Sequence, residues 1–161
     1  MTLNSEKIGE ILKTIPSESI EQTFAIAREL VEVHLKLGDL VLISGEMGAG
    51  KTTFVQGMAA AMQIKQTINS PTFTKLHIYN GDWTLNHLDL YNISNLSELE
   101  GFGIYDYIET DAGVSVVEWW QRFPSIFENL PHWHVTISGK NKQRIIKIEA
   151  RETICLKTSQ S

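Results

Sequence analysis

The chain has 161 residues, a net charge of −5 and a hydrophobic fraction of 42%, as expected for one globular domain. Its single cysteine, Cys155, excludes an internal disulfide and favours a reducing compartment. No apolar run approaches the ~18 residues that span a bilayer, and Glu6 and Glu10 interrupt any leader-like segment at the start. These features argue against a secreted scaffold or a membrane protein, and we expect a cytoplasmic protein.

The charges are unevenly distributed along the chain. Between Gly81 and Glu118 there are eight acidic residues and no Lys or Arg, whereas Gly139 to Ser161 contains six basic and two acidic residues. Such stretches are usually solvated surface. Alternatively, some of the acids hold a metal ion and the basic end faces an anionic partner. The negative total argues against binding nucleic acid through bulk charge.

Helices and buried strands alternate in the first part of the chain. Apolar residues recur at helical spacing from Ile20 to Lys36 and predict an amphipathic helix, with Pro16-Ser17 as its start signal. The apolar run Leu40–Ile43 is typical of a strand buried on both faces of a parallel sheet. A glycine-rich loop follows, and a second helical pattern runs from Phe54 to Met62.

Two hairpins, a helix and another buried strand are predicted further along the chain. Asn80-Gly81 is a favoured hairpin turn, and apolar residues alternate near the end of the chain as they do in a hairpin. The order of these elements indicates an α/β sheet with antiparallel additions. The predicted elements are strands Thr72–Tyr79 and Trp83–Leu88, helix Ser94–Glu100, strand Val114–Val117, and a hairpin over Trp133–Ala150 that turns at Gly139-Lys140-Asn141.

The glycine-rich loop carries the strongest functional signal. The segment Gly45-Glu46-Met47-Gly48-Ala49-Gly50-Lys51-Thr52 matches the P-loop pattern G-x-x-x-x-G-K-[ST]. Its glycines let consecutive N–H groups point at phosphate oxygens, and the helix that follows adds its positive N-terminus. Lys51 is expected to reach the β- and γ-phosphates, and the Thr52 hydroxyl to ligate Mg²⁺. We therefore expect residues 1–161 to form a single P-loop ATPase domain, a three-layer sandwich around a mostly parallel sheet.

Two acidic residues stand where a P-loop protein needs them. Asp89 directly follows the predicted strand Trp83–Leu88, and Glu118 directly follows the predicted strand Val114–Val117. A P-loop protein requires an acid at a neighbouring strand end to hold Mg²⁺ or its waters. Either residue alone is also compatible with a helix cap or a surface carboxylate. Together they form a candidate metal-binding pair.

Other classes of P-loop protein lack support. Asn141-Lys142-Gln143-Arg144 ends in Arg where the guanine-reading motif of GTPases has Asp, and no Asp is followed three positions later by Gly. Small-molecule kinases usually clamp their second substrate with several arginines, and Gly81 to Glu118 contains none. A small-molecule kinase stays open as an alternative to an ATPase. So does a nucleotide-gated adaptor, in which ATP binding rather than hydrolysis matters.

The order of the motifs resembles the TsaE family, also called YjeE. After the P-loop come Ser70-Pro71-Thr72-Phe73-Thr74, His87-Leu88-Asp89-Leu90-Tyr91 and Val117-Glu118-Trp119. The resemblance implies a small bacterial ATPase required for the threonylcarbamoyl modification of adenosine beside the tRNA anticodon. It also implies TsaB- and TsaD-like partner proteins, contact with tRNA that is at most indirect, and no membrane partner.

The resemblance also implies roles for individual residues. Thr52 and Glu118 would ligate Mg²⁺, and Asp89 would be the Walker B-like acid. Ser70 to Thr74 would form a switch segment near the γ-phosphate, with Trp119 beside the site. The implied catalytic residues are Lys51, Asp89 and Glu118, and the implied ATP-binding residues are Glu46, Met47, Gly48, Ala49, Gly50, Lys51, Thr52 and Thr53.

Two positions depart from the family pattern. Asn92 stands where the family usually has Arg, and Trp120 where it usually has Pro. With no arginine in an obvious finger role, we expect the isolated chain to hydrolyse ATP slowly and a partner to supply or organise the missing groups. For the adenine, the segment Glu21 to Thr23 and Arg144 are weak candidates.

Two further features are not expected to carry chemistry. His132 and His134 would share one strand face, but no Cys or nearby acid completes a metal site, so two half-exposed strand residues are expected. Cys155 has no neighbouring base in the sequence and is not expected to act as a nucleophile.

Overall fold

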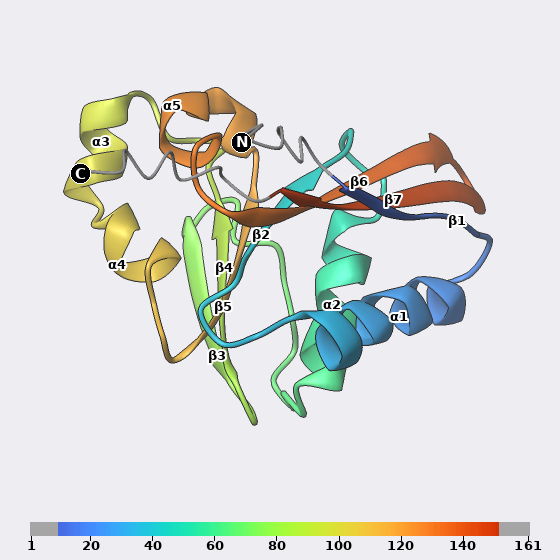
Figure 1. The fold of residues 1–161 in the computed structure, drawn as a ribbon. Helices are drawn as coiled ribbons and strands as arrows, with labels where there is room; N and C mark the ends of the chain where they lie inside the picture. Colours follow the sequence, from blue (N-terminus) through green and yellow to red (C-terminus); the bar gives the residue numbers. More distant parts are fainter. Residues whose placement is uncertain (1–9, 152–161) are drawn as a thin grey trace, which may run out of the picture.

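Seven strands of the chain form one mixed sheet (Figure 1). The computed structural model describes residues 10–151, with side chains from residue 13 onward, and Cys155 lies outside this range. The sheet order is β1-β7-β6-β2-β5-β4-β3. The strands are β1 (Glu10–Ser17), β2 (Leu40–Ser44), β3 (Leu76–Asn80), β4 (Thr84–Asp89), β5 (Gly113–Glu118), β6 (His132–Lys140) and β7 (Gln143–Arg151).

The middle of the sheet is parallel and its edges are antiparallel. The pairs β6–β2, β2–β5 and β5–β4 are parallel. The pairs β6–β7, β7–β1 and β4–β3 are antiparallel. This arrangement confirms the predicted parallel centre with antiparallel additions, and it brings the carboxyl ends of β2, β5 and β4 to one edge.

Helices cover both faces of the sheet and complete three layers (Figure 1). Val41 and Ile43 of β2 belong to the core under α1 and α2, whereas Leu40 and Leu42 belong to the core beside α3, α4 and α5. This alternation explains why β2 is a continuous apolar run. The helical segments are α1 (Ile20–Glu29), a π-helix (Leu30–His34), α2 (Lys51–Ala61), α3 (Leu96–Gly101), α4 (Ile104–Ile108), a 3₁₀ turn (Trp120–Arg122) and α5 (Pro124–Phe127).

A glycine sets the close packing of α1 on α2. A Cβ added at Gly57 would lie 2.9 Å from the Ala27 Cβ and 3.0 Å from the Phe24 Cα. Because Gly57 has no side chain, α2 can approach the backbone of α1. This contact holds α2, and with it the glycine-rich loop, against the rest of the domain.

The predictions for the start of the chain need correction. Pro16 lies inside β1, an edge strand that was not predicted, where a proline is tolerated because its missing N–H can face outward. The N-cap of α1 is Ser19, whose side chain accepts a hydrogen bond from the Gln22 N–H at 3.1 Å. Ile20, placed on the predicted apolar face, is 58% exposed. The helix ends at His34, two residues before the predicted end.

Several boundaries in the second half also differ from the predictions. The strand predicted from Thr72 begins only at Leu76, because the preceding residues form a turn that faces the glycine-rich loop. Helix α4, which follows Gly103 in a left-handed conformation, was not predicted. The predicted strands at Leu40, Trp83 and Val114, the helix before Gly101 and the terminal hairpin are confirmed within one or two residues.

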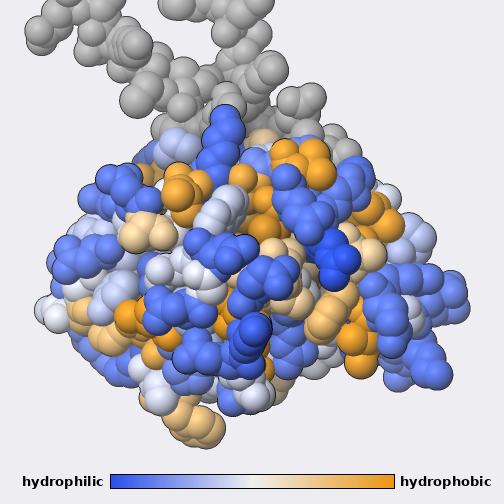
Figure 2. Space-filling view, turned by 90° about the horizontal axis from the view of Figure 1, so that it is seen from below, coloured by the Kyte–Doolittle hydropathy of each residue, from blue (hydrophilic) through white to orange (hydrophobic). Residues whose placement is uncertain are grey.

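One face of the molecule is largely polar. Figure 2 shows a face on which hydrophilic side chains predominate and hydrophobic ones form small separate groups. None of the helices within residues 10–151 combines the length and the apolar character needed to cross a membrane.

Candidate functional site

The register of three parallel strands builds the site. Ile43 of β2 is level with Glu118 of β5, and Asp89 of β4 is level with the same Glu118. The P-loop leaves β2 directly after Ser44. Both acidic side chains therefore lie at the sheet edge where the P-loop begins, as the strand-end positions predicted.

The P-loop adopts a conformation that needs its glycines. Gly48 and Gly50 have φ angles of +79° and +108°, a region that L-residues rarely adopt. Helix α2 starts at Lys51, and the Lys51 Nζ donates to the carbonyl oxygens of Gly45 and Glu46 at 2.5 and 3.2 Å. These two carbonyls hold the ammonium group across the mouth of the loop.

A hollow of about 470 Å³ lies against the P-loop. It contains six of the eight residues predicted to bind nucleotide; Glu46 and Ala49 do not line it. Ala49 is buried in the core, and Glu46 contributes its backbone carbonyl to Lys51. The lining residues are Met47, Gly48, Gly50, Lys51, Thr52, Thr53, Ser70, Thr72, Phe73, Asp89, Tyr91, Glu118, Trp119 and Arg144.

Asp89 is buried and held by two hydrogen bonds. Its Oδ1 accepts from the Tyr91 N–H at 2.9 Å, and its Oδ2 accepts from the Thr72 hydroxyl at 3.0 Å. Burial raises the pKa of the Asp89 carboxyl above its ordinary value, and the neighbouring Glu118 adds to the rise. The two hydrogen bonds thus fix the orientation of the carboxylate, and its raised pKa shows that its negative charge is poorly compensated.

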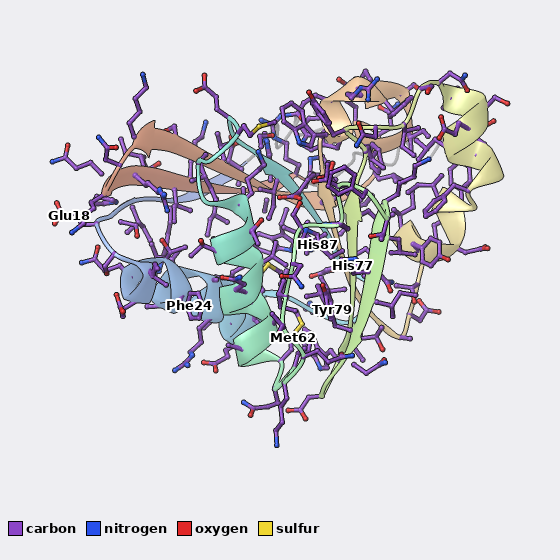
Figure 3. The ribbon with its side chains drawn as sticks, turned by 180° about the vertical axis from the view of Figure 1, so that it is seen from behind. Glu18, Phe24, Met62, His77, Tyr79 and His87 are labelled. Atoms are coloured by element: carbon purple, nitrogen blue, oxygen red, sulfur yellow. The ribbon has the colours of Figure 1, made fainter. Side chains whose placement is uncertain are left out.

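Glu118 is also buried, and a histidine lies behind it. The Nε2 of His87, which is fully buried on β4, lies 3.3 Å from the Glu118 Oε2. In Figure 3, His87 lies beside His77 of β3, and the two are directly opposite each other in the antiparallel register. Within residues 10–151, no Lys or Arg forms an ion pair with Glu118 or Asp89.

The segment before β3 closes one side of the hollow. Thr72 binds Asp89 as described, and the Asn92 side-chain amide donates to the Thr72 carbonyl at 3.0 Å. On β3, the His77 Nε2 and the Thr74 hydroxyl lie 2.7 Å apart. Phe73 points outward and is 92% exposed. Asn92, at a position where the family usually has Arg, thus fixes this segment through its backbone.

Trp119 also lines the hollow. Its φ of 59° and ψ of 28° place a large residue in the left-handed region, which is unfavourable unless the surroundings enforce it. The Lys51 Nζ lies 4.9 Å from the centroid of the indole ring, and the Tyr91 ring lies 5.0 Å from it. The strained turn thus brings an aromatic face to the P-loop lysine.

A hydrogen-bond network on Ser44 supports this turn. The Trp120 indole N–H and the Gln121 amide donate to the Ser44 Oγ at 3.0 and 2.7 Å. Because a hydroxyl accepts at most two hydrogen bonds, its own proton is left for the Nε2 of His134, at 2.8 Å. His134 therefore carries its proton on Nδ1, which lies 3.5 Å from a Glu149 carboxylate oxygen.

This network corrects the expectation for the two histidines. His132 is buried rather than half-exposed, and the Trp120 ring packs on both His132 and His134. Among residues 10–151, no group of three or more His, Cys, Asp or Glu side chains is placed to hold a metal ion. The pair serves packing and hydrogen bonding, with Trp120 taking part where the family usually has Pro.

The half-buried His134 predicts a stability that falls in acid. Burial lowers the pKa of His134 to about 4 from an ordinary 6.5. As the pH falls below 6.5, the unfolded chain therefore takes up this proton first, and stability is lost down to about pH 4. We expect His134→Gln to reduce this loss in urea unfolding curves between pH 7 and 4. Parallel pH profiles for the variant and the wild type would contradict the assignment.

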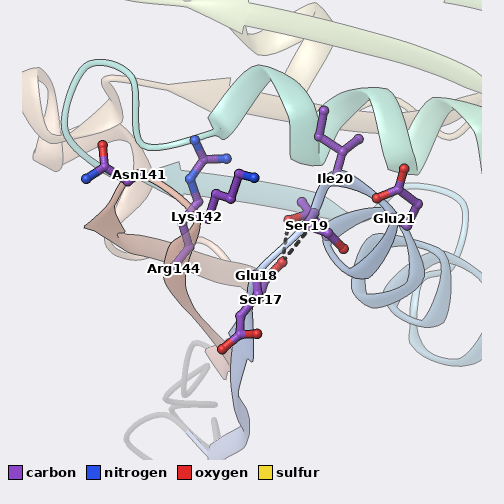
Figure 4. A pocket seen from close by; sticks show the side chains of 9 residues that line it. Ser17, Glu18, Ser19, Ile20, Glu21, Asn141, Lys142 and Arg144 are labelled. Carbon is purple, nitrogen blue, oxygen red and sulfur yellow. Dashed lines mark hydrogen bonds between the residues drawn. The ribbon is translucent and has the colours of Figure 1, made fainter.

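A second hollow, of about 360 Å³, adjoins the first through Arg144 (Figure 4). It lies between the start of α1 and the β6–β7 turn. The hydroxyls of Ser17 and Thr23 are hydrogen-bonded at 2.7 Å on its floor. The structure thus brings together the two weak candidates for an adenine site. The lining residues are Ser17, Glu18, Ser19, Ile20, Glu21, Thr23, Asn141, Lys142 and Arg144.

The first hollow fits a magnesium–nucleotide complex. It combines a left-handed glycine loop at a helix N-terminus, a lysine, and two buried carboxylates. A divalent cation held by these carboxylates would supply the positive charge that they lack. Thr52, which lines the same hollow, offers a hydroxyl ligand.

A strand that leads through this loop into a helix, with acids at the ends of the neighbouring strands, defines a protein of the P-loop nucleotide-binding class. The family model described as "Threonylcarbamoyl adenosine biosynthesis protein TsaE" matches residues 17–148. The chain belongs to the TsaE family.

Individual relatives agree with this assignment. The tRNA threonylcarbamoyladenosine biosynthesis protein TsaE of Treponema pallidum is 40% identical over 104 residues, which cover 65% of this chain and 74% of the relative. The protein of the same name from Aquifex aeolicus is 36% identical over 116 residues, with coverages of 70% and 80%. The crystal structure of YdiB from Bacillus subtilis superposes with a TM-score of 0.73 at 28% identity, covering 91% of this chain and 90% of that one.

Proposed function

We propose that the chain is an ATPase that binds Mg²⁺–ATP and serves the threonylcarbamoyl modification of tRNA adenosine. The observation that carries the proposal is the shared register of Asp89 and Glu118 beside the P-loop. The names of the relatives supply the pathway. A P-loop protein with acids in this position is equipped to bind a nucleotide and to hydrolyse it.

Each residue of the site has a distinct part in this proposal. The ammonium group of Lys51 exchanges its two carbonyl partners for the β- and γ-phosphates. Thr52 and Glu118 would hold Mg²⁺, and the ion would supply positive charge that stabilises the phosphates. Asp89, held by hydrogen bonds from Thr72 and Tyr91, would orient a water molecule beside this pair. His87 limits the orientations of Glu118 from behind.

The second hollow is the proposed place for the nucleoside. It adjoins the P-loop on the side of Arg144 and offers the polar groups of Ser19, Thr23 and Asn141. The Glu21–Thr23 segment, one of the two weak adenine candidates, forms part of its wall.

Partner proteins are proposed to complete the site. Met47, Phe73 and Tyr91 line the nucleotide hollow and are 77%, 92% and 43% exposed. Exposed apolar side chains around a polar site are typical of a surface that another protein covers. We assign this role to TsaB- and TsaD-like proteins, with tRNA in contact with them rather than with this chain.

Release of inorganic phosphate tests the proposal. The chain is expected to hydrolyse ATP slowly alone and faster with its TsaB- and TsaD-like partners, in both cases with free phosphate as the product. A phosphorylated small molecule in place of free phosphate would identify a kinase instead. Turnover by the chain alone as fast as in the complex would contradict the role of the partners.

A further inference from the structure

The first residue to consider is an arginine of the terminal hairpin that reaches the P-loop. Arg144 stands at the second position of β7, and its guanidinium points toward the loop that leads into α2 (Figure 4). A Cβ added at Gly50 would lie 2.7 Å from the Arg144 Nη1. The guanidinium group thus occupies the space that a side chain at position 50 would need.

The charge of Arg144 has no partner within the described residues. Its Nε is buried and has no hydrogen-bond partner, and none of the ion pairs among residues 10–151 includes it. By contrast, Lys147 and Arg151 of the same strand each lie 3.5 Å from a Glu149 carboxylate oxygen. A partly buried cation without a counter-charge is costly, so its position is best explained by an anionic ligand.

The position of Arg144 identifies the part of the ligand it meets. It lines both the P-loop hollow and the hollow assigned to the nucleoside. A nucleotide that filled both would place its α- and β-phosphates at the boundary between them. The planar guanidinium suits phosphate oxygens because it can donate two parallel hydrogen bonds.

We propose that Arg144 is a nucleotide-binding residue that holds the α- and β-phosphates of ATP and ADP from its position beside Gly50 of the P-loop. This inference rests on the proposed function. It assigns a ligand contact to one residue of the basic hairpin, Arg144. Lys142, in the turn of the same hairpin, is exposed and lines only the nucleoside hollow.

The test compares Arg144→Gln with Lys140→Gln, two neutralisations in the same hairpin; Lys140 is exposed and lines neither hollow. Affinities for ATP and ADP are measured by calorimetry in Mg²⁺ buffer, and adenosine is measured by competition against a labelled ADP. Arg144→Gln is expected to weaken ATP and ADP alike, by about 10- to 100-fold, as for loss of a charge-assisted hydrogen bond. It should leave the affinity for adenosine nearly unchanged, because adenosine has no phosphates, and Arg144→Lys should restore part of the affinity for ATP and ADP.

The outcomes separate this inference from the proposed function. Without nucleotide, Arg144→Gln should melt no lower than the wild type, because an unpaired charge is removed and no ion pair among residues 10–151 is lost. The rise of its melting temperature on adding ATP should be smaller than that of the wild type. Unchanged ATP affinity in Arg144→Gln, or an equal loss in Lys140→Gln, would overturn the inference. A loss of affinity for ATP but not for ADP would show that Arg144 contacts the γ-phosphate, and it would overturn the assignment to the α- and β-phosphates. Lys51→Ala serves as the reference: undiminished ATP binding by that variant would overturn the proposed function itself.

Discussion

Lys51→Ala is expected to lower the affinity for ATP by at least 100-fold. The Lys51 ammonium group lies at the mouth of the P-loop, where two carbonyls and the Trp119 ring hold it. Charge-assisted hydrogen bonds to phosphate oxygens are among the strongest in proteins, and the alanine side chain has no donor that could form them. Equilibrium titration with ATP in the presence of Mg²⁺ measures the effect.

The fold of the Lys51→Ala variant should be retained. The Lys51 side chain is buried, but its Nζ contacts only two carbonyls of its own loop and the Trp119 ring. Lys65→Ala, an exposed lysine outside the site, is the matched control and should bind ATP like the wild type. Tight ATP binding by folded Lys51→Ala would refute the assignment of the P-loop hollow as the nucleotide site.

Glu118→Gln is expected to lower the rate of ATP hydrolysis by at least 100-fold. The glutamine keeps the volume of the buried side chain but carries no charge, so it is a poor ligand for Mg²⁺. The affinity for ATP without Mg²⁺ should change little, because Glu118 is proposed to interact with the phosphates only through the metal ion. Phosphate release and metal-free ATP affinity, measured on the same preparation, separate the two effects.

Glu100→Gln is the control for this second prediction. Glu100 lies on α3, is exposed and does not line the nucleotide hollow. Its neutralisation should leave hydrolysis unchanged. A Glu118→Gln variant that hydrolyses ATP at the wild-type rate would remove Glu118 from the metal site. One that has lost hydrolysis but still supports tRNA modification would instead favour the nucleotide-gated adaptor.

The sequence predicted the centre of the fold and the candidate acids because these depend on local patterns. Leu40–Ile43 is apolar throughout, as β2 must be when both its faces are covered. Asp89 and Glu118 each end a strand, and parallel pairing brings such ends together without further information. The P-loop motif is also a local pattern, and the P-loop hollow lies where this motif predicted a phosphate site.

The features that escaped prediction depend on distant contacts. Strand β1 carries a proline and is defined by its pairing with β7, more than 100 residues away. Ser44 and His134 are 90 positions apart, so no local pattern reveals that they share a hydrogen bond. Arg144 belongs to a hairpin that is unremarkable in sequence, and only the sheet order β7-β6-β2 brings it close to the loop after β2.

The two departures from the family pattern acquire structural roles. The Asn92 amide holds the Thr72 carbonyl, and Thr72 in turn binds Asp89. The Trp120 indole donates to Ser44, the last residue of β2, and so braces the strained turn at Trp119. Neither residue lines the P-loop hollow; Asn92 contacts Thr72 and Trp120 follows Trp119, and both Thr72 and Trp119 line it.

The content of threonylcarbamoyladenosine in tRNA tests the central claim most directly. It would be measured by mass spectrometry of digested tRNA from bacteria whose own TsaE gene is replaced by one encoding this chain. The wild-type chain is expected to restore the modified nucleoside, and Lys51→Ala, produced at the same level, is expected to fail. Equal restoration by Lys51→Ala, or none by the wild type in the presence of compatible partners, would contradict the account of a nucleotide-driven protein of tRNA modification.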